Sequence, residues 1–430
     1  MEAVDVLIIG GGPAGLTAAS FCANPSVVLE QCASPARKLL ATGGGRCNVT
    51  HEESALSLAP HFGEASRFVL PALQAFPPEA IRAFFHDRGM RTVVEADGCV
   101  FPASQKASDV RDVLLRAAAE ARATIHCNTR VERFILEPEQ GTGLHRITGV
   151  VTSEGMFSPR HVVLAAGGQS YPELGSDGSG FALARSAGLE VSPPVPALAG
   201  LIIPLEWVVS LSGLLCEEGT IRIEAKGAPK KPVQGPILFT HKGLSGPPAL
   251  ALSGAINTRL LADNEVTIRV SFRHGRSVKE WLTLFGQWRQ QHGNRSIHNL
   301  LSGELPRALA VALCRLSGLE EVVAARAGKK ELEALATLCA ECPMKVTGTE
   351  GWGRAMLTRG GVALKELQAK TLASRNVSNL YCIGEVVDVD APCGGYNLTW
   401  AFASGFLAAQ AINQQLAQAR PARGSGPKSP

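Results

Sequence analysis

Four side chains that can donate or accept a proton stand next to glycine-rich segments of this chain. His241 follows an apolar run at residues 237–239, while Tyr171, Cys47 and Tyr396 each follow closely spaced glycines. A turn after a strand commonly presents a side chain into a cleft, and imidazole titrates near neutral pH. His241 is therefore our first candidate for a general acid. The other three are rival candidates, and a histidine that merely caps its turn is an equally good interpretation.

The start of the chain has the pattern of a dinucleotide-binding turn. An apolar strand at residues 5–9 leads into Gly10-Gly11-Gly12-Pro13-Ala14-Gly15, which fits G-x-G-x-x-G, and an alanine-rich helix follows. Gly10 permits the tight turn, Gly12 lets the backbone approach a pyrophosphate, and Gly15 lets helix and strand pack closely. The helix N-terminus offers free N–H groups to the phosphates. A second strand ends in Glu30, where an acid can bind ribose hydroxyls, so we expect a dinucleotide site that holds FAD or NAD.

Length and composition predict a soluble chain of two or three domains. The chain has 430 residues, of which 45% are hydrophobic and 19% charged. Its longest nearly apolar run, residues 201–216, is too short and too interrupted to cross a bilayer, and the early first strand leaves no room for a signal peptide. Eleven scattered cysteines indicate a reduced, cytoplasmic protein. Cys339-x-x-Cys342 has no second pair near it, so we expect no metal site.

Hydrophobic periodicity predicts an α/β chain with an insertion. Residues 66–122 are mainly helical around a β excursion at 92–102, and the strand at 124–126 would extend a parallel sheet. We expect a hairpin from 147–151 and 156–157, and a separate buried strand at 162–165. Clustered prolines at 193–196 suggest a domain boundary. An antiparallel β segment, helices over 277–340, a β return at 354–357, a buried strand at 380–383 and a last helix at 397–416 follow.

Positive charge is concentrated in the middle of the chain. Residues 226–330 contain sixteen Lys and Arg against six Asp and Glu, a local charge of +10. Basic side chains interleave there with Phe272, Trp281, Phe285 and Trp288, which is the general pattern of an RNA-binding surface. The Trp281, Phe285 and Trp288 spacing also suits a buried helix face, and that interpretation is favoured.

Six further motifs occur in order along the chain. They are Gly43-Gly44-Gly45-Arg46-Cys47-Asn48, Ala166-Gly167-Gly168-Gln169-Ser170-Tyr171-Pro172, Thr240-His241-Lys242-Gly243-Leu244-Ser245-Gly246-Pro247, Thr358-Arg359-Gly360-Gly361-Val362, Gly384-Glu385-Val386-Val387-Asp388-Val389-Asp390 and Gly394-Gly395-Tyr396-Asn397-Leu398. On these motifs the chain resembles the BaiN/RdsA-like family of NAD(P)/FAD-dependent oxidoreductases, within the two-dinucleotide-fold flavoproteins, over roughly residues 4–412. It departs from the family pattern at Cys393, where Thr is usual, at Leu372, where Met is usual, and at His51, where Asn is common.

The resemblance implies a Rossmann-like, discontinuous FAD-binding domain with two insertions. The FAD domain would comprise residues 1–192 and 352–418. An antiparallel β-domain would comprise residues 193–273 and 341–351, and a small helical domain residues 274–340. Residues 419–430 have the composition of a disordered tail.

The resemblance also implies the cofactor-binding residues. Gly10, Gly12, Pro13, Ala14 and Gly15 would hold the pyrophosphate, Glu30 the adenosine ribose, and the backbone of Val131 the adenine. Ala166 and Gly167 would close over the adenosine half, and Lys38 with Gly44, Gly45, Arg46, Cys47 and Asn48 would line the ribityl and flavin side. Gly384 and Glu385 would face ribityl or phosphate oxygens, with Asp388 as the competing acid. Gly394, Gly395, Tyr396 and Asn397 would direct a helix N-terminus at the flavin N1/O2 edge, which stabilises the reduced flavin.

Three functions are compatible with these features. The first is an FAD-dependent oxidoreductase that reduces an activated C=C bond of a small molecule, with NAD(P)H as electron donor although no second G-x-G-x-x-G follows a strand. The second fixes the substrate as ribosomal RNA, in which a uridine would become dihydrouridine. The third is a flavin-bound scaffold or sensor without turnover. Family members differ widely in substrate, so the resemblance does not choose among these functions.

Overall fold

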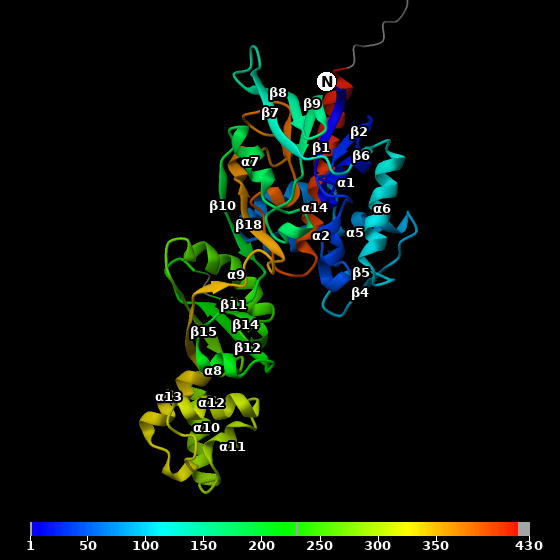
Figure 1. Cartoon of the computed structure of the whole chain (residues 1–430). Helices are drawn as coiled ribbons and strands as arrows, with labels where there is room; N and C mark the ends of the chain where they lie inside the picture. Colours follow the sequence, from blue (N-terminus) through cyan, green and yellow to red (C-terminus); the bar gives the residue numbers. More distant parts are fainter. Residues whose placement is uncertain (1, 229–230, 420–430) are drawn as a thin grey trace, which may run out of the picture. The chain divides into compact units, whose positions relative to one another are not determined.

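The computed structural model describes residues 2–228 and 231–419, which form two compact units (Figure 1). Unit 1 comprises Met1–Pro194 and Leu357–Pro430, and unit 2 comprises Val195–Met356. Each unit is considered by itself. Of the tail expected at residues 419–430, the part from 420 onward lies outside the described residues.

Unit 1 is built on a mixed sheet with the order β6-β2-β1-β9-β8-β7, and β19 pairs with β9. The parallel strands are β6 (Thr124–His126), β2 (Ser26–Leu29), β1 (Glu2–Ile9), β9 (Gly155–Leu164) and β19 (Leu380–Cys382). The antiparallel strands are β8 (His145–Thr152) and β7 (Val131–Pro138). Ile9 pairs with both Leu29 and Leu164, so the segments that follow β1, β2 and β9 meet at one edge of the sheet. This is the edge at which open α/β sheets bind ligands, and the predicted α/β class is confirmed.

Two sequence-based strand assignments need correction. Residues 156–157 and 162–164 belong to the single ten-residue strand β9, because Pro159 and Arg160 continue the extended backbone between them. Residues 155–157 of β9 pair with β8 and residues 157–164 pair with β1, which a local pattern does not reveal. The β return expected at 354–357 begins only at the last of these residues, as β18 (Leu357–Val362).

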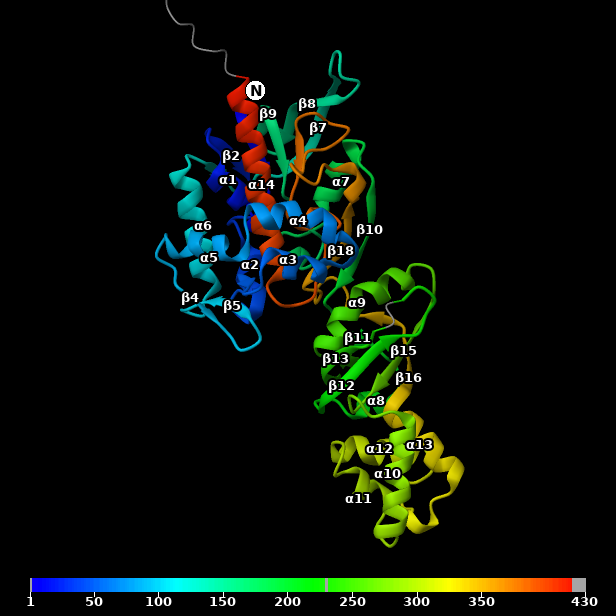
Figure 2. The same ribbon diagram turned by 180° about the vertical axis from the view of Figure 1, so that it is seen from behind.

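The long C-terminal helix α14 (Tyr396–Gln418) packs on the N-terminal helix α1 (Pro13–Phe21), as Figure 2 shows. A Cβ on Gly405 would overlap the carbonyl oxygen of Ala14, so glycine allows this close approach. Asn413 accepts the N–H of Ala23 and donates to the carbonyl of Phe21, each at 2.8 Å. Close packing and two hydrogen bonds therefore join α14 to α1 and the residues that follow α1.

Shorter elements complete unit 1. They are α2 (Arg37–Ala41), η1 (Thr42–Gly45), α3 (Ala55–Leu58), η2 (Ala59–Ala65), α4 (Ser66–Ala75), α5 (Pro78–His86), α6 (Ala107–Glu120), η3 (Pro172–Leu174), α7 (Ser179–Ser186), η5 (Leu364–Glu366) and η6 (Gly384–Val386). A small sheet has the order β3-β5-β4, from Thr50–His51, Cys99–Pro102 and Thr92–Val94. The strands β10 (Val191–Ala197) and β18 form a two-stranded sheet.

Unit 2 contains an antiparallel sheet with the order β16-β15-β12-β13-β14-β11-β17. Its strands are Cys342–Val346, Val266–Ser271, Leu215–Ile223, Val233–Thr240, Gly243–Ser245, Leu201–Ile202 and Gly348–Thr349. Helix α9 (Pro247–Leu260) packs on this sheet. The other helical elements are α8 (Glu206–Ser210), α10 (Val278–Gln291), α11 (Ile297–Leu301), α12 (Arg307–Leu316), η4 (Ala324–Arg326) and α13 (Lys329–Glu341). Sheet and helices share one buried hydrophobic cluster.

Candidate active site

Glycines shape the turn between β1 and α1. Gly10 has φ +109°, and a Cβ there would overlap the carbonyl oxygen of Ala165, which follows β9. A Cβ on Gly15 would overlap the carbonyl oxygen of Gly10, so α1 can start close to β1 only with glycine here. By contrast, a Cβ on Gly12 would meet none of the described atoms within 4 Å. The space in front of this helix N-terminus is open, as a pyrophosphate requires.

Glu30 ends β2 beside this turn and is only 9% exposed. Its Oε2 accepts the N–H of Gly11 at 2.9 Å, and its Oε1 accepts the N–H of Cys32 at 2.8 Å. The N–H of Thr129 donates to the Glu30 carbonyl at 2.9 Å, so the segment that leads into Val131 lies against the acid. A carboxylate oxygen has more than one lone pair, so Glu30 can accept further hydrogen bonds from hydroxyl groups.

A polar cluster joins four segments of unit 1 around Glu385. The ammonium of Lys38 lies 2.6 Å from Oε2 of Glu385, and the hydroxyl of Ser170 and the N–H of Thr358 donate to Oε1 at 3.0 and 2.9 Å. The Thr358 hydroxyl accepts the N–H of Gln169 at 2.7 Å. Lys38 and Glu385 neutralise each other's charge, and their side chains remain 19% and 18% exposed. The alternative acid, Asp388, accepts the N–H of Gly360 at 3.1 Å.

The glycine loop after α2 has three consecutive positive φ angles, 56°, 66° and 87° at Gly43, Gly44 and Gly45. The guanidinium of Arg46 lies 2.7 Å from Oε1 of Glu95 and stacks over the Phe101 ring at 4.1 Å from its centroid. This charge is therefore engaged within the protein, and the loop presents its backbone rather than the Arg46 side chain. The sequence alone gave no sign of the Glu95 partner, which lies 49 residues further along the chain.

Asn48, at the end of this loop, has a buried Oδ1 without a hydrogen-bond partner in the part of the chain that the structure describes. A Cβ on Gly395 would lie 2.7 Å from this oxygen. Unpaired acceptors of this kind are rare inside proteins and need an explanation. A ligand that brings an N–H group, such as the imide of a flavin ring, would satisfy it.

Helices α1 and α14 both begin at a glycine and both lack a side-chain cap. Gly12 and Gly395 are the N-caps, and neither first turn contains an acidic residue. Gly394 and Gly395 have φ 144° and 85°. The side chain of Asn397 accepts the backbone N–H of Ala391 and donates to its carbonyl, which fixes the preceding loop. The uncapped N–H groups of both helices remain available to an anion. Together with the open space at Gly12 and the orphaned oxygen of Asn48, they fit a flavin dinucleotide.

The remaining predicted cofactor residues lie near the same strand ends. Ala166 and Gly167 follow β9, and a Cβ on Gly167 would come within 3.0 Å of the Ser176 hydroxyl. A Cβ on Gly384 would lie 2.8 Å from the Cβ of Ala14. The turn after β19 therefore contacts the first turn of α1, which holds Pro13 and Ala14.

The four candidate proton donors lie in different surroundings. Burial raises the pKa of the Cys47 thiol to about 12, so it is a poor acid at neutral pH. Tyr171 is half-buried with φ 55°, before η3. Tyr396 is 6% exposed, and burial and then Glu53 raise the pKa of its phenol. His241 is exposed in the turn between β13 and β14 of unit 2, whereas the other three belong to unit 1.

The aromatic residues of the basic segment do not form a stacking surface. Trp281, Phe285 and Phe272 are at most 1% exposed, and Trp288 is 7% exposed, because one face of α10 packs into the core of unit 2. The interpretation of Trp281, Phe285 and Trp288 as a buried helix face is confirmed. The alternative, that RNA bases stack on these rings, is wrong. Several of the basic side chains between these aromatics also form salt bridges, namely Arg269 with Glu224, Arg273 with Glu218 and Arg276 with Glu304.

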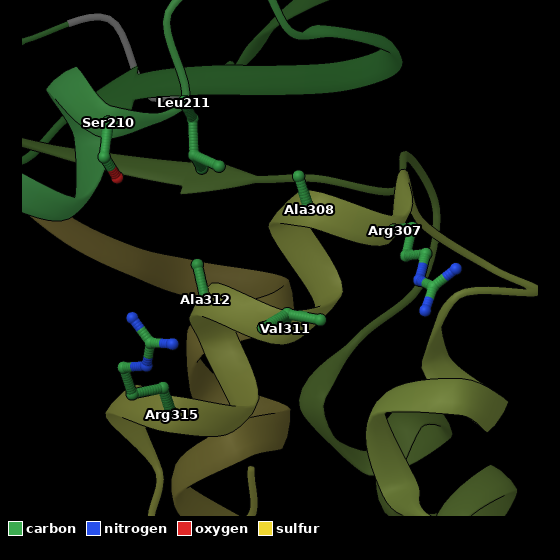
Figure 3. A pocket seen from close by; sticks show the side chains of 7 residues that line it. All are labelled: Ser210, Leu211, Arg307, Ala308, Val311, Ala312 and Arg315. Atoms are coloured by element: carbon green, nitrogen blue, oxygen red, sulfur yellow. The ribbon is translucent and has the colours of Figure 1, made fainter.

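An open hollow of about 480 Å³ lies between α8 and α12 in unit 2. Figure 3 shows Ala308, Val311 and Ala312 of α12 along it, with Arg307 and Arg315 near opposite ends of the helix. Arg315 pairs with Glu320, whereas no carboxylate lies within 4 Å of Arg307 among residues 2–228 and 231–419. Arg307 is thus an exposed cation on the helical part of this unit that remains unpaired among the described residues.

Two findings concern the environment of the protein. In the part of the chain with described structure, no helix combines the length and apolar character needed to cross a membrane. All eleven cysteines are free thiols, and Cys339 and Cys342 are buried where α13 ends and β16 begins.

Comparisons with known proteins identify the family to which this chain belongs. A family model described as "HI0933-like protein Rossmann domain" matches residues 4–411. The 3-dehydro-bile acid delta(4,6)-reductase of Clostridium scindens is 32% identical over 421 residues, which cover 95% of this chain and 98% of that protein. The ribosomal RNA dihydrouridine synthase of Escherichia coli is 29% identical over 432 residues, with the same two coverages.

Solved structures share the fold at low identity. The 3-ketosteroid delta1-dehydrogenase from Sterolibacterium denitrificans has a TM-score of 0.52 and 13% identity, covering 96% of this chain and 100% of that one. A flavocytochrome c3 fumarate reductase has a TM-score of 0.50 and 16% identity, covering 96% and 78%. The resemblance that the sequence motifs indicated is confirmed by the family match over residues 4–411. The chain belongs to the HI0933-like Rossmann-domain family and is a flavin-dependent oxidoreductase.

Proposed function

We propose that this chain reduces an activated C=C bond of a small molecule, with FAD as its cofactor and NAD(P)H as electron donor. The observation that supports FAD most is the combination of two uncapped helix N-termini with the unpaired Oδ1 of Asn48 in one unit. The name of the Clostridium scindens relative, a delta(4,6)-reductase, supports a C=C bond as the reacting group.

The chain's own residues would hold and orient this cofactor. The turn of Gly10, Gly12, Pro13, Ala14 and Gly15 binds the pyrophosphate, Glu30 the ribose, and Val131, Ala166 and Gly167 the adenosine half. Lys38, Gly44, Gly45, Arg46, Cys47, Asn48, Gly384, Glu385 and Asp388 line the ribityl and ring side. The start of α14, with Gly394, Gly395, Tyr396 and Asn397, places positive helix-dipole charge where reduction adds negative charge. When bound, reduced FAD supplies a hydride, and a side chain must add the proton.

This proposal is tested with purified protein under anaerobic conditions. We expect a yellow protein with one equivalent of FAD per chain that is bleached by NADH or NADPH and recoloured by an enone. A colourless protein, or a reduced protein that no enone reoxidises, would contradict it. The third hypothesis, a scaffold without turnover, predicts bound flavin but no steady consumption of NAD(P)H.

Ribosomal RNA is the second candidate substrate. The name of the Escherichia coli relative supports it, and so do the exposed cations of the helical part of unit 2, Lys279, Arg289, Arg295 and Arg307. These side chains can bind phosphates, but the buried aromatics cannot stack on bases. Reoxidation by RNA instead of an enone would favour this alternative. The free thiols support a reduced, cytoplasmic location in either case.

A further inference from the structure

Glu53 is the meeting point of three side chains in unit 1. Its Oε2 lies 3.2 Å from Nε2 of His61, its Oε1 lies 3.2 Å from Nδ1 of His51, and the Tyr396 hydroxyl donates to Oε1 at 3.3 Å. The Tyr396 ring is stacked between the two imidazoles, with centroid distances of 4.2 Å to His61 and 5.2 Å to His51. Segments 50–62 and 395–397, far apart in the chain, are joined by this cluster.

The cluster leads from the surface to the interior. The side chain of His61 is 36% exposed and that of Glu53 is 28% exposed, whereas Tyr396 is 6% exposed. Each step from His61 through Glu53 to Tyr396 is within hydrogen-bond reach, which proton transfer requires. His61 is the most exposed of these three side chains, so it is suited to exchange protons with water at the outer end.

The inner end of the cluster lies at the start of α14. Tyr396 is the first residue of this helix and follows Gly394 and Gly395. A Cβ on Gly394 would overlap the Tyr396 ring, so the ring lies over that glycine. A Cβ on Gly395 would in turn lie 2.7 Å from the unpaired Oδ1 of Asn48, so this turn lies beside that oxygen. A proton delivered to Tyr396 thus reaches the turn that would hold the flavin ring.

Other groups around the cluster favour a protonated phenol. The carbonyl of Asp97 lies 3.0 Å from Nε2 of His51, and the buried Cys99 and the Asp97 carboxylate also act on Tyr396. Burial first, and then Glu53, raise the pKa of the Tyr396 phenol, so it keeps its proton until a strongly basic centre forms beside it. Within the described ranges, His51, Glu53 and His61 are not arranged to hold a metal ion.

We propose that His61, Glu53 and Tyr396 form the proton-supply route of the enzyme, with Tyr396 as the proton donor and His51 as a positioning residue. This inference rests on the proposed function, because it names the proton source of that reaction. Reduction of a C=C bond adds a hydride, with two electrons, to one carbon and a proton to the other. Tyr396 gives its hydroxyl proton to the second carbon, and the phenolate regains a proton from His61 through Glu53, while water reprotonates His61.

The kinetic test compares Tyr396→Phe and Glu53→Gln with wild type and with Tyr381→Phe as the matched control, because Tyr381 lies in β19 and its buried hydroxyl has no hydrogen-bond partner among the described residues. Each protein is loaded with FAD, reduced by NAD(P)H and mixed rapidly with cyclohexenone. We expect full flavin content and normal reduction in all four proteins, but reoxidation slowed by about a hundredfold in Tyr396→Phe and Glu53→Gln. His61→Gln should be slowed less and should recover when imidazole is added to the buffer. Wild-type reoxidation rates in Tyr396→Phe would overturn the proposal.

A second readout does not depend on turnover. The chain has only three tyrosines, so fluorotyrosine-labelled protein gives three fluorine NMR signals that single Tyr→Phe variants assign. The Tyr396 signal should depend on pH because Tyr396 is coupled to His61 through Glu53, and this dependence should be lost in His61→Gln and altered in Glu53→Gln. A pH-independent Tyr396 signal would refute the relay even if Tyr396→Phe failed to bind FAD. If cyclohexenone does not reoxidise wild-type protein, the proposed function fails while the NMR result still decides on the relay.

Discussion

The N–H of Gly11 donates to Oε2 of Glu30 at 2.9 Å, so the turn expected to bind the pyrophosphate and the acid expected to bind ribose hold each other in place. The carboxylate is nearly buried, and its position is set before any ligand arrives. Such preorganisation reduces the cost of binding, because the side chain does not have to be ordered by the ligand.

Changing Glu30 to Gln should weaken FAD binding by roughly ten- to a hundredfold, because hydrogen bonds to a charged acceptor contribute about 1.5–3 kcal/mol. The flavin content of purified protein and fluorescence titration of apoprotein with FAD measure this. Glu132→Gln, at an exposed position of β7, is the control and should bind FAD as wild type does. Equal affinity in both variants would mean that Glu30 does not contact the cofactor.

Changing Gly12 to Val should abolish flavin binding without unfolding the protein. A Cβ at this position meets no described atom within 4 Å, so the only group that valine can displace is a ligand. Gly286→Val, on α10, also has open space around its Cβ and serves as the control. Absorbance at the flavin band reports binding, and circular dichroism reports folding. If Gly12→Val retains its full flavin content, the pyrophosphate does not bind at this turn.

His161 should make the stability of unit 1 depend on pH. It is 8% exposed in β9, and burial, followed by Arg146 and Arg160, lowers its pKa to about 4. His161 is therefore protonated near its ordinary pKa of 6.5 in the unfolded chain, but only near pH 4 in the folded chain. Its neutral form therefore contributes fully to the free energy of unfolding above pH 6.5, and this contribution is lost as the pH falls toward 4. The loss should reach roughly 3 kcal/mol, at about 1.36 kcal/mol per pKa unit. Urea unfolding at several pH values measures how the free energy of unfolding changes with pH. This pH dependence should be smaller in His161→Gln, but not in the exposed control His145→Gln.

If RNA is bound, exposed cations of unit 2 should provide the phosphate contacts. Replacing Arg289, Arg295 and Arg307 together by Glu should weaken binding of ribosomal RNA fragments and make it less dependent on salt, because fewer counterions are released. Arg67, Lys106 and Lys370 of unit 1 are equally exposed, so their replacement by Glu is a control with the same change of charge. Arg273 and Arg276 are less suitable targets, because both are paired with glutamates. The same loss in both triple variants would indicate only a nonspecific effect of net charge.

His241→Ala tests the first candidate for the general acid. If Tyr396 supplies the proton, this variant should keep its FAD, its reduction by NAD(P)H and most of its reoxidation rate. Rapid-mixing absorbance separates the two half-reactions. Slowing of reoxidation alone by about a hundredfold would return the role to His241 and contradict the relay. Tyr171→Phe is the next variant to compare in that case.

The strand, glycine turn and helix at the start of the chain could be predicted because the physics of this motif is local. The motif lies within about thirty residues and consists of a strand, glycines at fixed spacing, and an acid after the next strand. These residues are close enough in the sequence for their spacing to predict the turn. The Trp281, Phe285 and Trp288 face was also predictable, since helical spacing of large apolar side chains indicates burial.

Pairings across long stretches of chain could not be predicted. The sequence suggested that the Arg46 guanidinium could approach an anion, whereas the structure shows that it contacts Glu95 and Phe101. His51 was noted only as a departure from the family pattern, and Glu53 and His61 not at all, because nothing local relates them to Tyr396 more than 330 residues away. Strand β9 was divided in two because its pairing partners, β1 and β8, lie on different sides of it in the sheet.

The close packing of α14 on α1 bears on how the chain folds during synthesis. Helix α14 is synthesised long after α1, so the apolar face of α1 that Gly405 and its neighbours cover has no partner until α14 has been made. Contacts of such long sequence separation form late and are costly in loop entropy. The nascent chain therefore cannot complete its flavin site early, and a ribosome stalled before residue 396 should carry a chain that captures no flavin.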